Sequence, residues 1–98
     1  MNNVTKIPVN SRTPSLLDAY RQALADGYNK TVDCERLDLS TVNVMVGFLA
    51  AATIALRLIG NEHWAARFEE CATMLEQNWS LYEKAIPALC AELDARAA

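Results

Sequence analysis

The chain has few glycines, prolines and cysteines, three of each among 98 residues. A β-sandwich joins many short strands through turns that glycine and proline favour, so this shortage argues against one. A disordered chain would be poor in apolar residues, whereas 52% of these residues are apolar and 21% are charged. Basic residues are also scarce, nine against twelve acidic, and the net charge of −3 argues against direct nucleic-acid binding. The length fits one small domain.

The three cysteines, Cys34, Cys71 and Cys90, are widely spaced and include no Cys-x-x-Cys pair. We therefore expect neither a disulfide framework nor a zinc site. Residues 1–6 lack the apolar run of a signal peptide, which predicts a cytoplasmic protein. The single histidine, His63, has no nucleophile or second base at a recognisable spacing. We expect no catalytic, metal-binding or cofactor-binding role for it or for the cysteines.

A long uncharged run, residues 39–56, approaches the length of a membrane-spanning helix. Ser40, Thr41, Asn43 and Thr53 interrupt this run with polar groups, and much of the remainder is alanine, which is only weakly hydrophobic. The sequence therefore favours a central helix that other helices cover, and no membrane partner is expected.

The beginning of the chain differs from the rest. Pro8 disfavours a helix and biases Ile7 toward an extended backbone. We expect residues 1–12 to form an extended arm and residues 13–98 to form a single helical domain. The arm is either a frayed terminus or a segment that lies in a groove of another protein.

Helix signals predict an all-α fold that begins with one short helix. Thr13 can cap this helix, and Pro14 suits its first position because the N–H that proline lacks has no intrahelical partner there. Asp26-Gly27 ends the helix, since glycine readily adopts the left-handed conformation of a helix cap. Residues 28–37 are polar and mixed in charge, which indicates a connection.

Two longer helices follow and should form an antiparallel hairpin. Asp38 or Ser40 caps the second helix, which runs to about Ile59, and Gly60-Asn61 then ends it and starts the third. Pro87 should kink or stop the third helix. Seven apolar side chains recur along this third helix at steps of three or four: Trp64, Phe68, Cys71, Leu75, Trp79, Tyr82 and Ile86.

The second helix is apolar on more than one side, so more than one side of it must be covered. Small residues four positions apart on this helix allow another backbone to approach closely. Three helices of this length enclose little interior, and small domains often compensate by oligomerising. We therefore expect a homodimer whose interface includes Val42, Val46, Gly47, Ala51 and Ala55.

The arm and the first helix have the least need to belong to the core. The arm is not helical, and the apolar stripe of the first helix is narrow. An extended segment that becomes ordered on binding can cover a wide surface of a partner protein. The predicted partner-binding residues are Ile7, Val9, Arg12, Leu16, Tyr20 and Leu24.

Three segments, residues 7–14 (IPVNSRTP), 15–20 (SLLDAY) and 42–59, carry a resemblance in overall format. Together they resemble the small bacterial anti-activators of quorum sensing, of the QslA and TraM types. The resemblance implies a compact, mostly helical protein that binds a LuxR-type transcription factor and prevents its dimerisation or DNA binding. It includes no signature motif, so it assigns no functional residue.

These features favour a non-enzymatic regulator that binds and inhibits another protein, and an anti-activator is the first candidate. A phage-type inhibitor such as an anti-CRISPR protein is the alternative of similar size and acidity. A secretion chaperone or an immunity protein is the alternative from another class. An enzyme ranks below these, because the sequence has no glycine-rich phosphate loop and no G-x-S-x-G motif.

Overall fold

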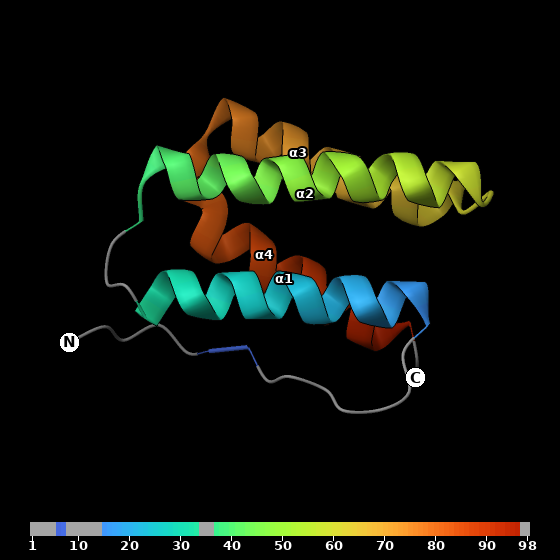
Figure 1. The fold of residues 1–98 in the computed structure, drawn as a ribbon, viewed down its shortest axis with the longest axis horizontal. Coiled ribbons are helices and arrows are strands. Elements are labelled where there is room, and N and C mark those ends of the chain that lie inside the picture. The colour runs from blue at the N-terminus through green and yellow to red at the C-terminus, as the bar shows by residue number, and fades with distance from the viewer. Residues whose placement is uncertain (1–5, 8–14, 34–36, 97–98) are drawn as a thin grey trace.

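The computed structural model describes residues 6–7, 15–33 and 37–96, which contain four α-helices. These are α1 (Leu16–Asp33), α2 (Leu39–Leu58), α3 (Glu62–Gln77) and α4 (Tyr82–Ala95), with a short 3-10 helix, η1 (Trp79–Leu81), before α4. No strand occurs in the described ranges, so the predicted all-α class is confirmed. Successive helices run in opposite directions, with α2 beside α3 and α1 packed on α4 (Figure 1).

The corner between α2 and α3 lies where the sequence predicts it. Gly60 has a φ of 81°, and its N–H bonds the carbonyl of Arg57 at 3.1 Å, while the N–H of Asn61 bonds the carbonyl of Leu56 at 2.8 Å. This pair of bonds satisfies carbonyls at the end of α2 that have no partner within the helix. The side chain of Asn61 then accepts from the N–H of Trp64 and caps α3.

The first helix is longer than predicted, because α1 continues through Gly27. Tyr28 and Val32, which belong to the expected connection, are buried, and the ring of Tyr28 stacks on Tyr82 with centroids 5.5 Å apart. A glycine inside a helix costs roughly 0.5–1 kcal/mol. Burying one large apolar side chain contributes about 1.5–3 kcal/mol, which outweighs that cost. The predicted connection is therefore wrong over residues 28–33.

The predicted third helix is broken at Asn78 and not at Pro87. The side chain of Asn78 accepts from the N–H of Ser80 at 3.2 Å and from its hydroxyl at 2.6 Å, which stabilises the turn into η1. Pro87 lies inside α4, where it has no N–H to donate to the carbonyl of Glu83. Tyr28 of α1 donates its hydroxyl to that carbonyl at 3.4 Å. A contact from another helix therefore satisfies the group that Pro87 leaves without its usual donor.

The core draws apolar side chains from all four helices. Two ion pairs cover its edges at α4: Arg67 of α3 with Glu92 at 2.6 Å, and Arg21 of α1 with Asp94 at 2.9 Å. The largest fully buried side chains are Tyr28, Tyr82, Phe68, Leu24, Leu49, Leu56, Leu75, Ile86, Leu89, Leu93, Val42 and Cys90.

Candidate binding surfaces

The helix α2 is apolar on two opposite sides, and only one of them is buried. Its inner side supplies Leu49 and Leu56 to the core. On the opposite side, Val44, Ile54 and Leu58 are 74%, 63% and 82% exposed. Steps of three and four residues place these side chains and the small residues between them in one stripe. We call this stripe the outer face of α2, and it comprises Val44, Gly47, Ala51, Ile54 and Leu58.

The outer face of α2 carries no charge, and the charge at its end is paired. Arg57, beside Leu58, bonds Glu62 at 3.0 Å and Glu69 at 3.3 Å. The bonds to Glu69 and then to Glu62 raise the pKa of Arg57 above its ordinary value. By length and composition Leu39–Leu58 could cross a membrane, and 33% of this stretch is buried inside the structure. Exposed apolar patches are typical of surfaces that contact other molecules.

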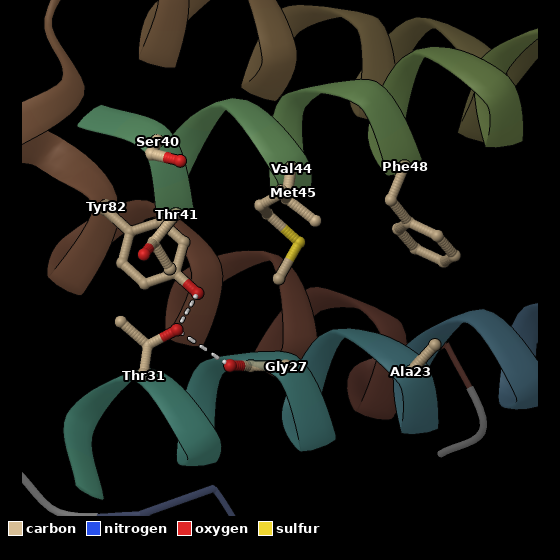
Figure 2. Close-up of a pocket in the computed structure, with 9 residues that line it drawn as sticks. All are labelled: Ala23, Gly27, Thr31, Ser40, Thr41, Val44, Met45, Phe48 and Tyr82. Carbon is tan, nitrogen blue, oxygen red and sulfur yellow. Dashed lines mark hydrogen bonds between the residues drawn. The ribbon is translucent and has the colours of Figure 1, made fainter. Parts of the chain in front are cut away.

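A hollow of about 380 Å³, the α1–α2 groove, lies where α1 and α2 make little contact (Figure 2). At one end Tyr82 Oη lies 3.2 Å from Thr31 Oγ1, which donates its single proton to the carbonyl of Gly27. Tyr82 is therefore the donor to Thr31. Burial raises the pKa of Tyr82, which keeps this donor protonated. These buried polar groups already satisfy one another. The lining residues are Ala23, Gly27, Thr31, Ser40, Thr41, Val44, Met45, Phe48 and Tyr82.

The backbone of Ile7 is hydrogen-bonded to α1, and a cavity lined by residues of α4 adjoins Ile7. In the side-chain amide of Asn29, Oδ1 accepts from the N–H of Ile7 and Nδ2 donates to the carbonyl of Ile7, both at 2.8 Å. Two residues paired in a β-sheet exchange bonds in the same way. The side chain of Ile7 is only 8% exposed. The adjacent cavity is lined by Lys6 and Ile7 of the arm and by residues of α1 and α4. We call this place the arm seat; it consists of Asn29 and the lining residues of α1 and α4, which are Arg21, Pro87, Cys90, Ala91 and Asp94.

Ion pairs fix the two helices that form the arm seat. Arg21 makes a two-bond fork with Asp94, from Nε to Oδ1 at 3.0 Å and from Nη2 to Oδ2 at 2.9 Å. Arg96 bonds Asp18 and joins α4 to α1 a second time. The pKa of Asp18 is lowered first by the bond from the backbone N–H of Ser15 and then by Arg96. The positions of α1 and α4 are thus set by directional bonds as well as by packing.

The predicted partner-binding residues do not form one exposed surface. Leu24 is completely buried in the core, and Ile7 is buried in the arm seat, so both are wrong as freely exposed contacts. The narrow apolar stripe of α1 packs against α4 and the core of the same chain, and these residues are therefore buried and not exposed to a partner. Leu16 is 41% exposed. Tyr20 is half-buried, and its ring is nearly perpendicular to that of Phe48, with ring centroids 5.7 Å apart. The other two predicted contacts, Val9 and Arg12, lie outside the described residues.

The predicted dimer residues are divided between the two sides of α2. Val42 is completely buried within the chain and is therefore wrong as an interface residue, and Val46 packs against the core. Gly47 and Ala51 are exposed on the outer face, and Ala55 is half-buried beside it. The prediction missed the large members of this face, which are Val44, Ile54 and Leu58. Their helical spacing, which places them on one side of α2, is the signal in the sequence that could have found them.

The remaining reactive side chains are buried or dispersed. Burial raises the pKa of the thiols of Cys71 and Cys90 to about 11, which leaves little nucleophilic thiolate near neutral pH. His63 is exposed, and its ring is nearly perpendicular to that of Trp64, with ring centroids 5.2 Å apart. No group of three His, Cys, Asp or Glu side chains that could hold a metal ion occurs in the described part of the chain. Cys34 lies outside that part.

Comparison of the chain with protein-family models, with curated proteins and with solved structures finds no match. The outer face of α2 and the arm seat are therefore the two features of the structure that bear on function.

Proposed function

We propose that the protein is a non-enzymatic, cytoplasmic regulator that forms a homodimer and inhibits a partner protein. The observation that carries the proposal is the uncharged outer face of α2, whose large members are more than half exposed in the single chain. Association of this face with a second copy would remove its apolar surface from water, which is the main driving force of protein association. The buried thiols with raised pKa values support a role without covalent chemistry.

The outer face of α2 is complementary to itself. A two-fold axis brings the same patch of both copies together. If two α2 helices cross in opposite directions about an axis near Ala51, Val44 of one copy faces Leu58 of the other. In the same register Ile54 of one copy lies within one residue, about 1.5 Å along the helix, of the level of Gly47 of the other, so a large side chain packs beside a position with no side chain. This pairing of large with small residues favours a second copy as the occupant, since close packing needs such complementary shapes.

The oligomeric state of matched variants tests the proposal. We expect the wild type to sediment as a dimer at micromolar concentration and Ile54→Glu to sediment as a folded monomer, because the substitution would bury an unpaired charge. Met74→Glu is the control, since Met74 is an exposed apolar residue on α3, away from the outer face. A monomeric wild type would contradict the homodimer, and so would a dimer that survives Ile54→Glu.

For the inhibited partner, we propose a LuxR-type transcription factor, on the basis of the resemblance to quorum-sensing anti-activators. The small all-α fold suits a protein that masks the dimerisation surface of its target. Capture of partners from a bacterial lysate, with the Ile54→Glu variant in parallel, tests this assignment. A LuxR-type factor would support it. A nuclease complex would indicate a phage-type inhibitor, and a secreted effector or toxin would indicate a chaperone or immunity protein.

A further inference from the structure

The arm seat binds a peptide backbone through contacts that do not depend on the peptide's sequence. Both hydrogen bonds from Asn29 go to the N–H and carbonyl groups of Ile7, at 2.8 Å each. Every residue except proline carries this donor and acceptor pair. Any extended segment that places one residue opposite Asn29 can make the same two bonds, and the adjacent cavity then selects its side chain. These are the two elements of extended-peptide recognition: backbone bonds for affinity and a side-chain pocket for specificity.

The side chain of Ile7 does not use all the space beside it. A cavity of about 280 Å³ adjoins it, and its lining includes the apolar atoms of Pro87, Cys90 and Ala91. Three charged residues line this cavity: Arg21 and Asp94, which are paired with each other, and Lys6, which precedes Ile7 in the arm and would leave with it when the arm is displaced. A pocket of this kind favours an uncharged side chain longer than isoleucine, because such a side chain would gain the contacts that Ile7 leaves unmade.

The connection to α1 makes Ile7 an occupant that is always close to the seat. Eight residue steps separate Ile7 from Ser15, and a chain of that length reaches at most about 26–29 Å. Thirteen steps along α1, from Leu16 to Asn29, span about 20 Å. The arm therefore reaches the seat of its own chain, where a tethered segment acts at an effective concentration on the order of millimolar.

We propose that the arm seat is the recognition site for an extended segment of a partner protein that carries a leucine, methionine or phenylalanine opposite Asn29. Ile7 is then a competitor built into the chain, and the partner binds by displacing it. This inference deepens the proposed function, because it states the chemistry of the partner's segment.

Displacement can be followed in the wild-type chain by NMR. The probe is a peptide of residues 1–12 with Ile7→Phe, unlabelled, added to the ¹⁵N-labelled protein. We expect the amide signal of Ile7 to move and to lose its protection from hydrogen exchange, because its bond to Asn29 is broken. The same peptide with Ile7→Asp is the control and should leave the signal in place. An amide signal of Ile7 that stays unchanged at millimolar Ile7→Phe peptide would overturn the proposal.

A variant with a weakened competitor gives a second, independent measurement. The full chain with Ile7→Asp should bind the fluorescently labelled Ile7→Phe peptide at least about tenfold more tightly than the wild type, because its seat is no longer occupied. Adding Asn29→Asp should weaken that binding, since a carboxylate of the same size accepts from the N–H but has no donor for the carbonyl. Asn43→Asp, on the exposed side of α2, is the matched control. Equal affinity of the wild-type and Ile7→Asp chains for the peptide would contradict the proposal that Ile7 competes for the arm seat.

Two further outcomes separate this inference from the homodimer. The monomeric Ile54→Glu chain should bind the peptide as the wild type does, so failure of the dimer leaves this test intact. Protection of the Ile7 amide should not change with protein concentration, because the arm occupies the seat of its own chain. Protection that rises with concentration would assign the seat to arm exchange between copies and overturn the proposal.

Discussion

The helices α1 and α2 are similar in length and lie next to each other (Figure 1). The side chains on their outward sides differ in polarity. On α1 the exposed positions include Asp26 and Lys30, and the apolar side is buried. On α2 the exposed positions from Val44 to Leu58 include the large apolar residues of the outer face. The outward side of α1 is suited to water, whereas the outward side of α2 is suited to contact with another molecule.

The same two helices also differ in what holds them. The helix α1 is attached to α4 by two ion pairs, Arg21 with Asp94 and Arg96 with Asp18, in addition to its apolar contacts. The helix α2 meets α3 through apolar packing, and its one ion-paired residue, Arg57, lies at its end. Directional bonds therefore set the position of α1, while the burial of one apolar side sets the position of α2. Three experiments test this difference.

The largest expected effect separates the two sides of α2. Leu56 is completely buried and Leu58 is 82% exposed, two residues further along the same helix. In the monomeric Ile54→Glu background, Leu56→Ala should lower the free energy of unfolding by about 2–5 kcal/mol, because it leaves a cavity in the core. Leu58→Ala should change it by less than about 0.5 kcal/mol. Urea unfolding measures both, and a similar cost for the two variants would show that the outer face is buried within the monomer.

A smaller effect compares the glycines inside the two helices. Gly47→Ala in α2 should raise the stability of the monomeric background by roughly 0.5–1 kcal/mol, because alanine favours the helix and the added methyl group has no heavy atom within 4 Å besides its chain neighbours and the nearby backbone of α2. Gly27→Ala in α1 should gain less, because its methyl group would lie 3.1 Å from the terminal carbon of Met45.

The same two glycine substitutions should differ in their effect on association. In the otherwise wild-type chain Gly47→Ala should weaken the dimer, because it fills the space that Ile54 of the second copy would occupy. Gly27→Ala should leave the dimer unchanged, since Gly27 is not on the outer face. Thermal unfolding and sedimentation measure the two effects. A dimer unaffected by Gly47→Ala would place the contact elsewhere.

The smallest effect concerns acid. Contacts lower the pKa of Asp18 from its ordinary 3.8, with Ser15 as the main cause, and Arg67 lowers that of Glu92 from 4.5. Carboxyls with lowered pKa values stabilise the fold above their unfolded values, and this contribution is lost as pH falls below about 4.5. For the partly exposed pair of Glu92 with Arg67, which solvent screens, it should be under about 1 kcal/mol.

Because Glu92 lies on α4 and Asp18 bonds both Ser15 at the start of α1 and Arg96 at the end of α4, acid should loosen α4 and the start of α1 before it affects the pairing of α2 with α3. Hydrogen exchange measured helix by helix between pH 6 and pH 3 tests this order. Glu92→Gln is the control, and it should reduce the difference between the protection of α4 at pH 6 and its protection at pH 3. Earlier loosening of α2 would contradict the assignment of the ion pairs to α1 and α4.

The ends of α2 were predictable because they depend on local chemistry. Asp38 caps the helix by accepting from the N–H of Thr41 at 2.8 Å, and Gly60 ends it with a positive φ. Each of these features involves residues within a few positions of one another. The end of α1 was not predictable in this way, because Tyr28 and Val32 are helical through their burial against distant parts of the chain.

The candidate surfaces were only partly visible in the sequence. Gly47 and Ala51 were recognised as positions of close approach, but a helix that is apolar on two sides does not reveal which side its own chain covers. The seat of Ile7 had no local signal at all, because Asn29 lies 22 positions away and its amide is an ordinary polar group until the fold brings it to the arm. An apolar arm residue near a polar helix residue is too common a pattern to predict such a pairing.

The sequence by itself determined the helical class, the caps at Gly60 and Asn61, a cap of α2 at Asp38 or Ser40, and the existence of more apolar surface on α2 than a small core needs. These properties follow from backbone conformation and side-chain periodicity, which act over one or two helical turns. Only the tertiary structure decided that α1 extends beyond Gly27, that Tyr28 satisfies the carbonyl opposite Pro87, and that Asn29 holds Ile7. Those outcomes require contacts between residues more than twenty positions apart, and such contacts form only when all four helices pack together.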